Sequence, residues 1–497
     1  MKNLLTLFLF AITLHGSSQV LYDVAKGQLG SSPYMLTSFN GKLFFYGIDS
    51  NNVDQAWYAD VNNAPQSLNI KAFVGTAQAN RFYENGLYAQ DKMGICNGKL
   101  YTGMTSATSA KLYEYDGINP PVIAPGMAST NITSPRHIVS LNDKLYFGAF
   151  NNGAHDLWEY TPATGNTKKI TNNAASTLIP RVLNTAVYNG KIYFHDKSLK
   201  FSQYDPVSGN ISQPKINGSP FYPADIHVYN GKMYVKAHVA ASMSLYEFDG
   251  TNFTALTTPP LDLDIYNSTG PYTGNTIIGY NGAIYYAARK YTDPKPVFEL
   301  HKYDLGTKTV SKIVQGSGAQ IILPNFFCEY GGRLFFQASD DVHGTELWCY
   351  DGINPPYIAA EITAGSQGSF PTELTVVDKT LFFAAINRNP NITGTELYKL
   401  YTPGLDVANI HFKGEATIYP NPTHDYTTLS ITLQQPQTLH ISITDAQGRV
   451  VYNIPARYYA AQQHSIQLPV AQLAAGVYQY AIYNSNILLA SGKLVRE

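Results

Sequence analysis

The hydrophobic and polar positions of this chain repeat in blocks of about 48 residues over most of its length. Each block contains an Asn-Gly or similar turn, followed at once by an apolar strand rich in Leu, Phe and Tyr. Asn-Gly supplies the positive φ angles of a type I′ turn, so each copy predicts a β-hairpin. The copies of the turn begin at Asn40, Asn97, Asn142, Asn189, Asn230, Asn281, Gly331 and Asp378.

Each block also predicts a third and a fourth strand after this hairpin. A third strand recurs with a polar turn after it, as in residues 111–117, 244–250 and 346–352. A weaker fourth strand follows, and four antiparallel strands at this repeat length are typical of a β-propeller blade. The sequence therefore predicts an all-β fold with an eight-bladed propeller, with seven or nine blades as the alternatives.

The two ends of the repeat array predict that the blades close into a ring. Residues 20–25 resemble a fourth strand that has no blade of its own, whereas the last block stops near Tyr401 after three strands. We expect the N-terminal strand to complete the last blade. Closure of this kind removes exposed sheet edges, which would otherwise pair with other chains.

The loops that vary most in length and composition are predicted to share one face of the disc. The tight hairpin turns are expected on one face of the disc. The loops between second and third strands and the links between blades then lie together on the opposite face, which we call the loop face. Binding residues are concentrated in such loops on a rigid scaffold. An aromatic loop residue such as Tyr291 is a candidate to stack on a sugar ring. The candidate binding residues of this loop face are Asp262, Asp264, Tyr291, Asp340, Asp341 and His343.

The acidic candidates each have two interpretations. Asp262 and Asp264 alternate along one strand, so their carboxylates point the same way and form either a calcium site or two solvated carboxylates. Asp340, Asp341 and His343 are either polar ligands or a turn-capping Asp beside an exposed His. Apart from calcium, the sequence predicts no cofactor.

Composition excludes several classes of function. Charged residues make up only 14% of the chain, the net charge is −1, and no basic block is present. Nucleic acid is therefore not an expected partner, because its binding needs a concentrated basic surface. Cys96, Cys328 and Cys349 lack the number and spacing of a disulfide framework or a zinc site. The common catalytic motifs are missing from the sequence, and no catalytic residue is predicted.

The N-terminal residues are typical of a secretory signal peptide. Lys2 precedes an apolar run from Leu4 to Leu14, and the small residues Gly16 and Ser18 predict cleavage before Gln19. We expect residues 1–18 to be removed, with a buried N-terminal strand as the alternative. No other apolar stretch is long enough to span a bilayer, so an integral membrane protein is not expected.

After the repeats the pattern changes to short alternating strands. Residues 403–414 contain Pro and Gly and predict a linker between a propeller at 19–402 and a second domain at 415–497. Roughly six or seven strands in this last segment predict a small immunoglobulin-like β-sandwich.

The seventh block contains Glu346, Leu347, Trp348, Asp351 and Gly352, followed by an isoleucine. The block thereby resembles the repeat family named for its ELWxxDGT signature, with isoleucine in place of the final threonine. The eighth block keeps the sequence GTELY at 394–398. This resemblance implies a propeller on a secreted protein, and the family carries no established chemistry to transfer.

The C-terminal segment carries short motifs in a fixed order. Their residues are Tyr419, Pro420, Asn421, Pro422, Asp445, Gly448, Arg449, Gly476, Tyr478 and Lys493. With these motifs the segment is similar to the sorting domain of the type IX secretion system over its whole length. The resemblance implies translocation across the outer membrane, removal of the tail, and the secretion machinery as a partner. It also implies a protein outside the cell or attached to the outer surface of a Gram-negative bacterium. The alternative is that the matching residues are merely turn residues of a sandwich.

Three functions from different classes fit these observations. The leading hypothesis is a secreted or surface-displayed binding or adhesion module for a glycan or a protein. The rival is a secreted polysaccharide hydrolase or lyase with carboxylates at the mouth of the propeller channel. The third is a structural component of the cell surface without a binding site. Fold alone does not decide among them.

Overall fold

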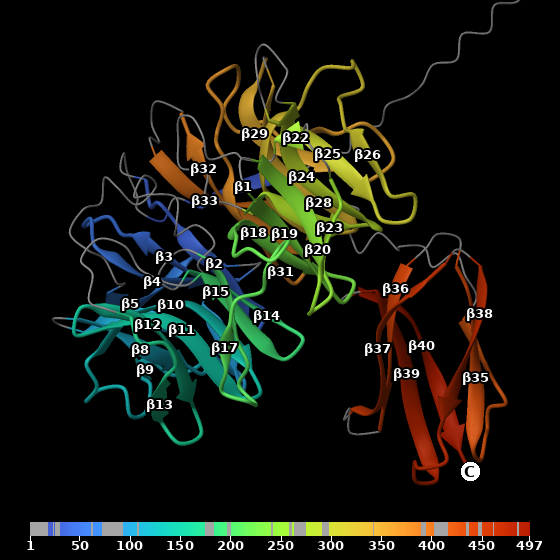
Figure 1. The fold of residues 1–497 in the computed structure, drawn as a ribbon. Helices are drawn as coiled ribbons and strands as arrows, with labels where there is room; N and C mark the ends of the chain where they lie inside the picture. Colours follow the sequence, from blue (N-terminus) through green and yellow to red (C-terminus); the bar gives the residue numbers. More distant parts are fainter. Residues whose placement is uncertain are drawn as a thin grey trace, which may run out of the picture.

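The regular elements of the structure are β-strands, and no helix occurs in the described part of the chain (Figure 1). The computed structural model describes residues 18–22, 24, 30–60, 63–71, 93–106, 109–173, 183–195, 200–239, 242–257, 261–262, 275–290, 298–340, 342–388, 394–401, 416–433, 437–445, 450–460, 462–484 and 487–497. No helix of these residues is long and apolar enough to cross a membrane.

The first half of the chain forms successive four-stranded antiparallel sheets, in which strand order follows chain order. The first sheet contains β2 (Tyr34–Phe39), β3 (Lys42–Ile48), β4 (Asp54–Ala59) and β5 (Gln66–Lys71). The second contains β6 (Gly94–Cys96), β7 (Lys99–Ser106), β8 (Ser109–Tyr115) and β9 (Val122–Ile123). The third contains β10 (Ile132–Leu141), β11 (Lys144–Asn151), β12 (Ala154–Thr161) and β13 (Asn166–Lys169). The fourth contains β14 (Leu183–Tyr188), β15 (Lys191–His195), β16 (Phe201–Tyr204) and β17 (Ile211–Ser212). The fifth contains β18 (Tyr222–Tyr229), β19 (Lys232–Val239), β20 (Ser242–Phe248) and β21 (Phe253–Ala255).

Two further units of the same kind are joined in one nine-stranded sheet, because Glu299 pairs with Ile322 across their boundary. The sixth unit contains β23 (Ile277–Tyr280), β24 (Ala283–Lys290), β25 (Glu299–Asp304) and β26 (Thr309–Lys312), with β22 (Leu261–Asp262) paired to the end of β24. The seventh unit contains β27 (Ile322–Tyr330), β28 (Arg333–Asp340), β29 (Gly344–Tyr350) and β30 (Tyr357–Ala360).

The last four-stranded sheet of the repeat array combines the two ends of that array. Its strands are β31 (Thr372–Val377), β32 (Thr380–Asn387), β33 (Gly394–Tyr401) and, at the outer edge, β1 (Ser18–Tyr22). β1 pairs antiparallel with β33, with Val20 opposite Lys399. The prediction that an N-terminal strand completes the last block is confirmed. β1 begins at Ser18, the last residue of the predicted signal peptide, whereas residues 1–17 lie outside the described residues.

The predicted hairpin turns are present with the expected backbone. Asn40 and Gly41 have φ angles of 50° and 69°, and the Asn-Gly pairs of other units have nearly the same values. In six units, within the ranges that the structure describes, the polar turn after the third strand is held by an aspartate. For example, Asp351 Oδ1 accepts the backbone N–H groups of Ile353 and Asn354 at 2.8 and 2.7 Å. These aspartates therefore serve turn geometry.

Each sheet packs on both of its neighbours through a separate apolar core. Phe44 of the first sheet, for example, meets Tyr115 of the second edge-to-face with ring centroids 5.2 Å apart. An apolar core likewise joins each further pair of successive units. The first sheet also packs on the last, so the blue and orange strands lie side by side in Figure 1. The residues of this closing core are Leu36, Leu43, Phe45, Trp57, Ala59, Val377, Phe382 and Leu397.

A buried glutamate fixes the start of the third strand in the seventh unit to the segment that leads into the next unit. The Glu346 carboxylate accepts hydrogen bonds from the Ser369 hydroxyl and from the Ile362 backbone N–H. The Ser369 N–H donates to the Thr345 carbonyl at 2.8 Å. Backbones approach so closely here that a Cβ on Gly344 would collide with the Ser366 carbonyl. We call this arrangement the glutamate clasp.

A second glutamate clasp closes the repeat array. The backbone N–H of Ser31 donates to Glu396 Oε1 at 3.0 Å, and the Ser31 hydroxyl donates to Glu396 Oε2. Ser31 and Glu396 are both fully buried. The clasps use the GTEL residues of the seventh and eighth blocks, so the glutamate of the ELW signature serves packing between neighbouring units.

The C-terminal segment forms two sheets around one core of its own. One sheet contains β34 (Ala416–Tyr419), β35 (Tyr426–Thr432) and β38 (Gln463–Pro469). The other contains β37 (Val450–Tyr459), β36 (Gln437–Thr444), β39 (Gly476–Asn484) and β40 (Ile487–Arg496), in that order. Side chains of both sheets, such as Leu429 and Ile441, meet in this core. The predicted linker at 403–414 lies outside the described residues, and the predicted domain boundaries stay predictions.

Stability at neutral pH is predicted to depend on Glu346. Burial raises the pKa of its carboxyl from an ordinary value near 4.5 to about 7. The folded state therefore holds the proton more tightly than the unfolded state. The stabilisation that comes from this proton is complete below pH 4.5 and is lost as pH rises through 7. The unfolding free energy then falls by about 3 kcal/mol, because a change of one in pKa corresponds to ~1.4 kcal/mol.

The measurement is thermal unfolding of the wild type and Glu346→Gln at pH 5 and pH 8. Glutamine imitates the protonated acid, so the variant should match the wild type at pH 5 and exceed its Tm at pH 8. Asp143→Asn, at an exposed carboxyl in the hairpin turn of the third sheet, is the control. Equal pH dependence in wild type and Glu346→Gln would contradict the prediction.

Removing the hydroxyl of Ser31 is predicted to weaken closure of the array. Ser31→Ala removes the hydrogen bond from the hydroxyl to the buried Glu396 carboxylate, and loss of a buried bond to a charged group costs ~1–3 kcal/mol in unfolding free energy. Chemical denaturation of Ser31→Ala and of the control Ser50→Ala, at an exposed serine, measures this cost. The role of the clasp is refuted if both variants unfold at the same denaturant concentration.

Candidate functional site

The hairpin between β28 and β29 holds an aspartate and a histidine against each other. Asp340 Oδ1 accepts the backbone N–H groups of Val342 at 3.0 Å and His343 at 2.6 Å. Its other oxygen, Oδ2, lies 2.9 Å from His343 Nδ1. Asp340 therefore caps the turn, as one of the two interpretations of the sequence has it. It also orients the His343 ring, which remains partly exposed.

Each partner changes the protonation of the other. The hydrogen bond from His343 to Asp340 is the main reason that the pKa of His343 is raised above its ordinary value. Burial raises the pKa of Asp340, but hydrogen bonds from the backbone and ring of His343 outweigh this effect, and the pKa is lowered. The pair thus favours the ionised form of the carboxyl and shifts the ring toward its protonated form.

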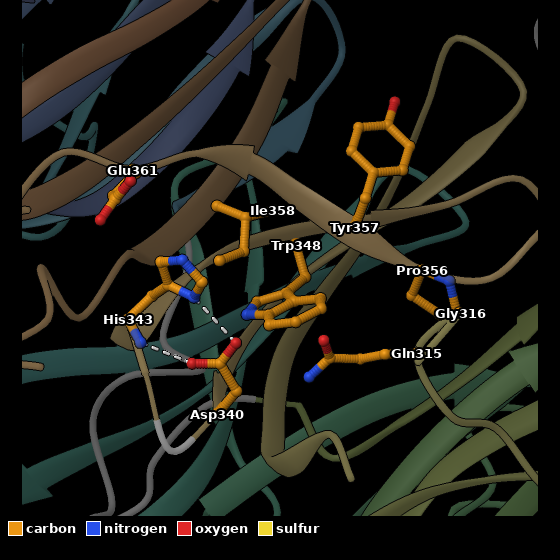
Figure 2. Close-up of a pocket in the computed structure, with 9 residues that line it drawn as sticks. All are labelled: Gln315, Gly316, Asp340, His343, Trp348, Pro356, Tyr357, Ile358 and Glu361. Atoms are coloured by element: carbon orange, nitrogen blue, oxygen red, sulfur yellow. Dashed lines mark hydrogen bonds and ion pairs between the residues drawn. The ribbon is translucent and has the colours of Figure 1, made fainter. Parts of the chain in front are cut away.

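These two residues line one end of a pocket of about 390 Å³ at the boundary between the sixth and seventh units (Figure 2). Gln315 and Gly316 come from the link between β26 and β27, and Trp348 from β29. Figure 2 shows Gln315 extending toward Trp348 and Asp340 from the neighbouring unit, and Glu361 beyond His343. The lining residues are Gln315, Gly316, Asp340, His343, Trp348, Pro356, Tyr357, Ile358 and Glu361.

Trp348 contributes a polar atom that the fold leaves without a partner. Its side chain is 1% exposed, and its indole N–H has no hydrogen-bond partner. In the first sheet, Trp57 occupies the same register position, opposite Phe45 as Trp348 lies opposite Phe336. There the indole N–H donates to the Gly47 carbonyl at 3.0 Å. Figure 2 shows the Trp348 indole nitrogen on the side of the ring nearest Asp340 and His343.

The remaining lining residues form the less polar end of the pocket. Ile358 lies beside the Trp348 ring, and Tyr357 points away from the Asp340–His343 end (Figure 2). The Tyr357 hydroxyl accepts a hydrogen bond from Arg333 at 3.0 Å, which fixes its direction. The pocket therefore has a polar end with donors and acceptors and an end lined by aliphatic and aromatic carbon.

The structure brings two of the predicted loop-face residues, Asp340 and His343, together in the pocket. Asp262 lies in β22, where its backbone pairs with Arg289. Asp264, Tyr291 and Asp341 lie outside the described residues.

Sequence reasoning missed the pocket residues Gln315, Trp348, Tyr357 and Glu361 as members of one site. In the sequence Trp348 belongs to the repeat signature, which does not mark it as a pocket residue. No spacing in the sequence links it to Gln315, because the two residues belong to different units. Among the described residues, no group of three or more His, Cys, Asp or Glu side chains is arranged to hold a metal ion.

The sorting motifs at the two ends of the C-terminal domain lie against each other. Asn421 Nδ2 donates to the Lys493 carbonyl at 2.7 Å, and the Val495 N–H donates to Asn421 Oδ1 at 2.8 Å. Thr423 continues this pairing, since its N–H donates to the Val495 carbonyl and its carbonyl accepts the Glu497 N–H, each at 3.0 Å. We call these four bonds the terminal tie.

Several other motif residues serve this fold locally. Gly476 pairs with Arg496 at the start of β39, and the Tyr478 hydroxyl donates to the Ala474 carbonyl at 2.8 Å. Asp445 follows the end of β36. Gly448 and Arg449 lie outside the described residues.

Comparison with known proteins identifies the C-terminal domain. Residues 417–497 match the family described as the secretion system C-terminal sorting domain. The predicted type IX sorting domain is thereby confirmed, and it indicates a secreted or cell-surface protein that engages the secretion machinery. No curated protein matches the chain.

Two solved structures are similar to the chain at low identity. One is a puromycin-hydrolysing peptidase of Mycobacterium tuberculosis, with 8% identity, a TM-score of 0.43 and coverage of 76% of this chain. The match spans 62% of that peptidase, less than two thirds of its length. The other is a catalytically inactive virginiamycin B lyase from Staphylococcus aureus with quinupristin, with 12% identity and a TM-score of 0.38. That match covers 65% of this chain and 96% of the lyase.

Loss of the terminal tie is predicted to lower export. Asn421→Ala removes the two bonds that hold Lys493 and Val495, so the last strand should fray and the secreted fraction should fall severalfold. The control is Asn453→Ala, at an exposed asparagine of the same domain. Immunoblots of medium and cell fractions from a type IX-secreting bacterium measure the effect. Equal secretion of both variants would show that the tie is dispensable.

Proposed function

We propose that this protein is an exported binding module whose repeat array is an eight-bladed β-propeller. Support for the blade number comes from eight copies of the hairpin turn and from eight apolar cores, one between each unit and the next, including last and first. The immunoglobulin-like sandwich behind it acts as the sorting tail. The tail is removed during export, and the propeller is released or attached to the outer cell surface.

The observation that carries a binding role is the pocket beside Asp340 and His343. Its polar residues come from the second-to-third-strand loop and from the links between units, which are the segments expected on the loop face. Convergent polar groups beside apolar carbon in a pocket of a few hundred Å³ are typical of small-ligand recognition. A glycan or a protein side chain at the cell surface is the ligand class that we propose.

The rival function is hydrolase- or lyase-type cleavage of a polysaccharide by carboxylates at the mouth of the propeller channel. It requires an acid and a base that flank the bond to be cleaved. Within the pocket, the Asp340 carboxylate is bound by two backbone N–H groups and by His343. These bonds lower its pKa, which suits a fixed acceptor for a ligand better than a general acid.

Binding is predicted without product release. The purified full chain should bind one or more members of an array of polysaccharides and glycans, with no new reducing ends or unsaturated products in the supernatant. An Asp340→Ala variant should bind at least roughly tenfold more weakly, because it loses both an acceptor and the anchor of His343. Release of cleaved product would overturn the binding module in favour of the enzyme.

A further inference from the structure

The pocket at the boundary of the sixth and seventh units offers both donors and acceptors at its polar end. The acceptors are the amide oxygen of Gln315 and the site left on the Asp340 carboxylate, which already accepts two backbone N–H groups and bonds the His343 ring. The donors are the Trp348 indole N–H and the second hydrogen of the Gln315 amide, whose Nε2 already donates to the Gln320 carbonyl at 3.3 Å. A ligand that satisfies this set must itself donate and accept within a few ångströms. Hydroxyl groups do both.

The buried indole N–H is the observation that points to a ligand. A buried donor without a partner is disfavoured by ~1–3 kcal/mol, so native structures rarely keep one. Of the two other tryptophans at this register position, Trp57 has its partner in the Gly47 carbonyl, whereas the buried indole N–H of Trp158 lacks one, as that of Trp348 does. What sets Trp348 apart is that it lines the pocket, with its nitrogen on the side facing Asp340 and His343. An oxygen atom of a bound molecule would supply the missing acceptor.

The charges around the pocket select against ionic ligands. An anion would meet the carboxylates of Asp340 and Glu361, and the one basic side chain of the lining, His343, is already paired with Asp340. A cation would have to compete with His343, which already occupies Asp340 Oδ2 at 2.9 Å. A neutral molecule avoids both conflicts. The carbon-lined end at Ile358 and Pro356 fits the C–H face of a pyranose ring.

We infer that this pocket binds a neutral sugar residue, with Trp348 donating to a ring or hydroxyl oxygen and Asp340 and Gln315 bonding its hydroxyl groups. This inference rests on the proposed binding function and names the ligand class of the same site. It excludes uronic acids and sulfated sugars as the preferred ligands. It also makes the sixth unit a part of the site through Gln315.

The experiment follows the indole N–H signals of the three tryptophans in ¹H–¹⁵N spectra of the full chain. The probes are the methyl glycosides of glucose, galactose, mannose and xylose, and methyl glucuronide as the charged counterpart of the glucose probe. At least one neutral glycoside should shift the Trp348 signal and leave that of Trp57 in place. Methyl glucuronide should bind at least tenfold more weakly than methyl glucoside, or shift nothing. The Trp348→Phe spectrum assigns the signal.

Substitutions elsewhere in the pocket test the site without changing the core, in which Trp348 itself is packed. Gln315→Ala, at the rim, should weaken binding of the neutral glycoside roughly three- to tenfold. Gln320→Ala, an exposed glutamine on the same link, should leave it unchanged. Trp348→Phe should abolish or greatly weaken binding, whereas Trp158→Phe, at the equivalent position of the third sheet, should not.

The outcomes separate this inference from the proposed function. Glycan binding that leaves the Trp348 signal and the Gln315→Ala variant unaffected would overturn the inference and keep the binding module, with its site elsewhere. Equal or tighter binding of the glucuronide would overturn the neutral ligand class. If no glycoside and no array glycan binds, both the inference and a glycan-binding role fall.

Discussion

Closure of the first sheet on the last is the constraint on which the rest of the repeat array depends. A four-stranded sheet with two apolar faces is stable only when both faces are covered. Each unit covers one face of the next, so an open array would leave two faces exposed to water, one at each end. Leu36 and Phe45 at one end and Phe382 and Leu397 at the other bury these faces against each other. The clasp between Ser31 and Glu396 and the pairing of β1 with β33 hold that contact in register.

The same packing explains where the candidate site lies. Neighbouring units meet through large side chains in the middle of each sheet, and loops of different length meet at the margins. At the margin between the sixth and seventh units, the link at Gln315 stands beside the hairpin at Asp340 and leaves a pocket over Trp348. Trp348 belongs to the core of this boundary and to the wall of the pocket at once. A rigid core thereby fixes the direction of a polar atom that faces the pocket.

The sequence predicts a feature best when the residues that form it lie close together in the chain or belong to the repeat pattern. Hairpin turns such as Asn40-Gly41 depend on two residues, so their backbone was predictable. The pairing of β1 with β33 was predictable because the repeat pattern lacked one strand at one end and had one to spare at the other. Asp340 and His343 are three residues apart, and their contact is local. Gln315, Trp348 and Glu361 come from separate segments of two units, and no local pattern encodes their meeting.

The sorting domain follows the principle of the repeat array on a smaller scale, because its first motif is fixed to its last strand. Asn421 and Thr423 bond the backbone of residues 493–497, more than 70 residues further along the chain. Neither closing contact can form until its own domain has been synthesised, since each joins residues near opposite ends of that domain. The motif residues of the tail are therefore best understood through the structure that they close. Asn421 holds the strand that contains Lys493, so a sequence motif at one end secures the conformation of the motif at the other.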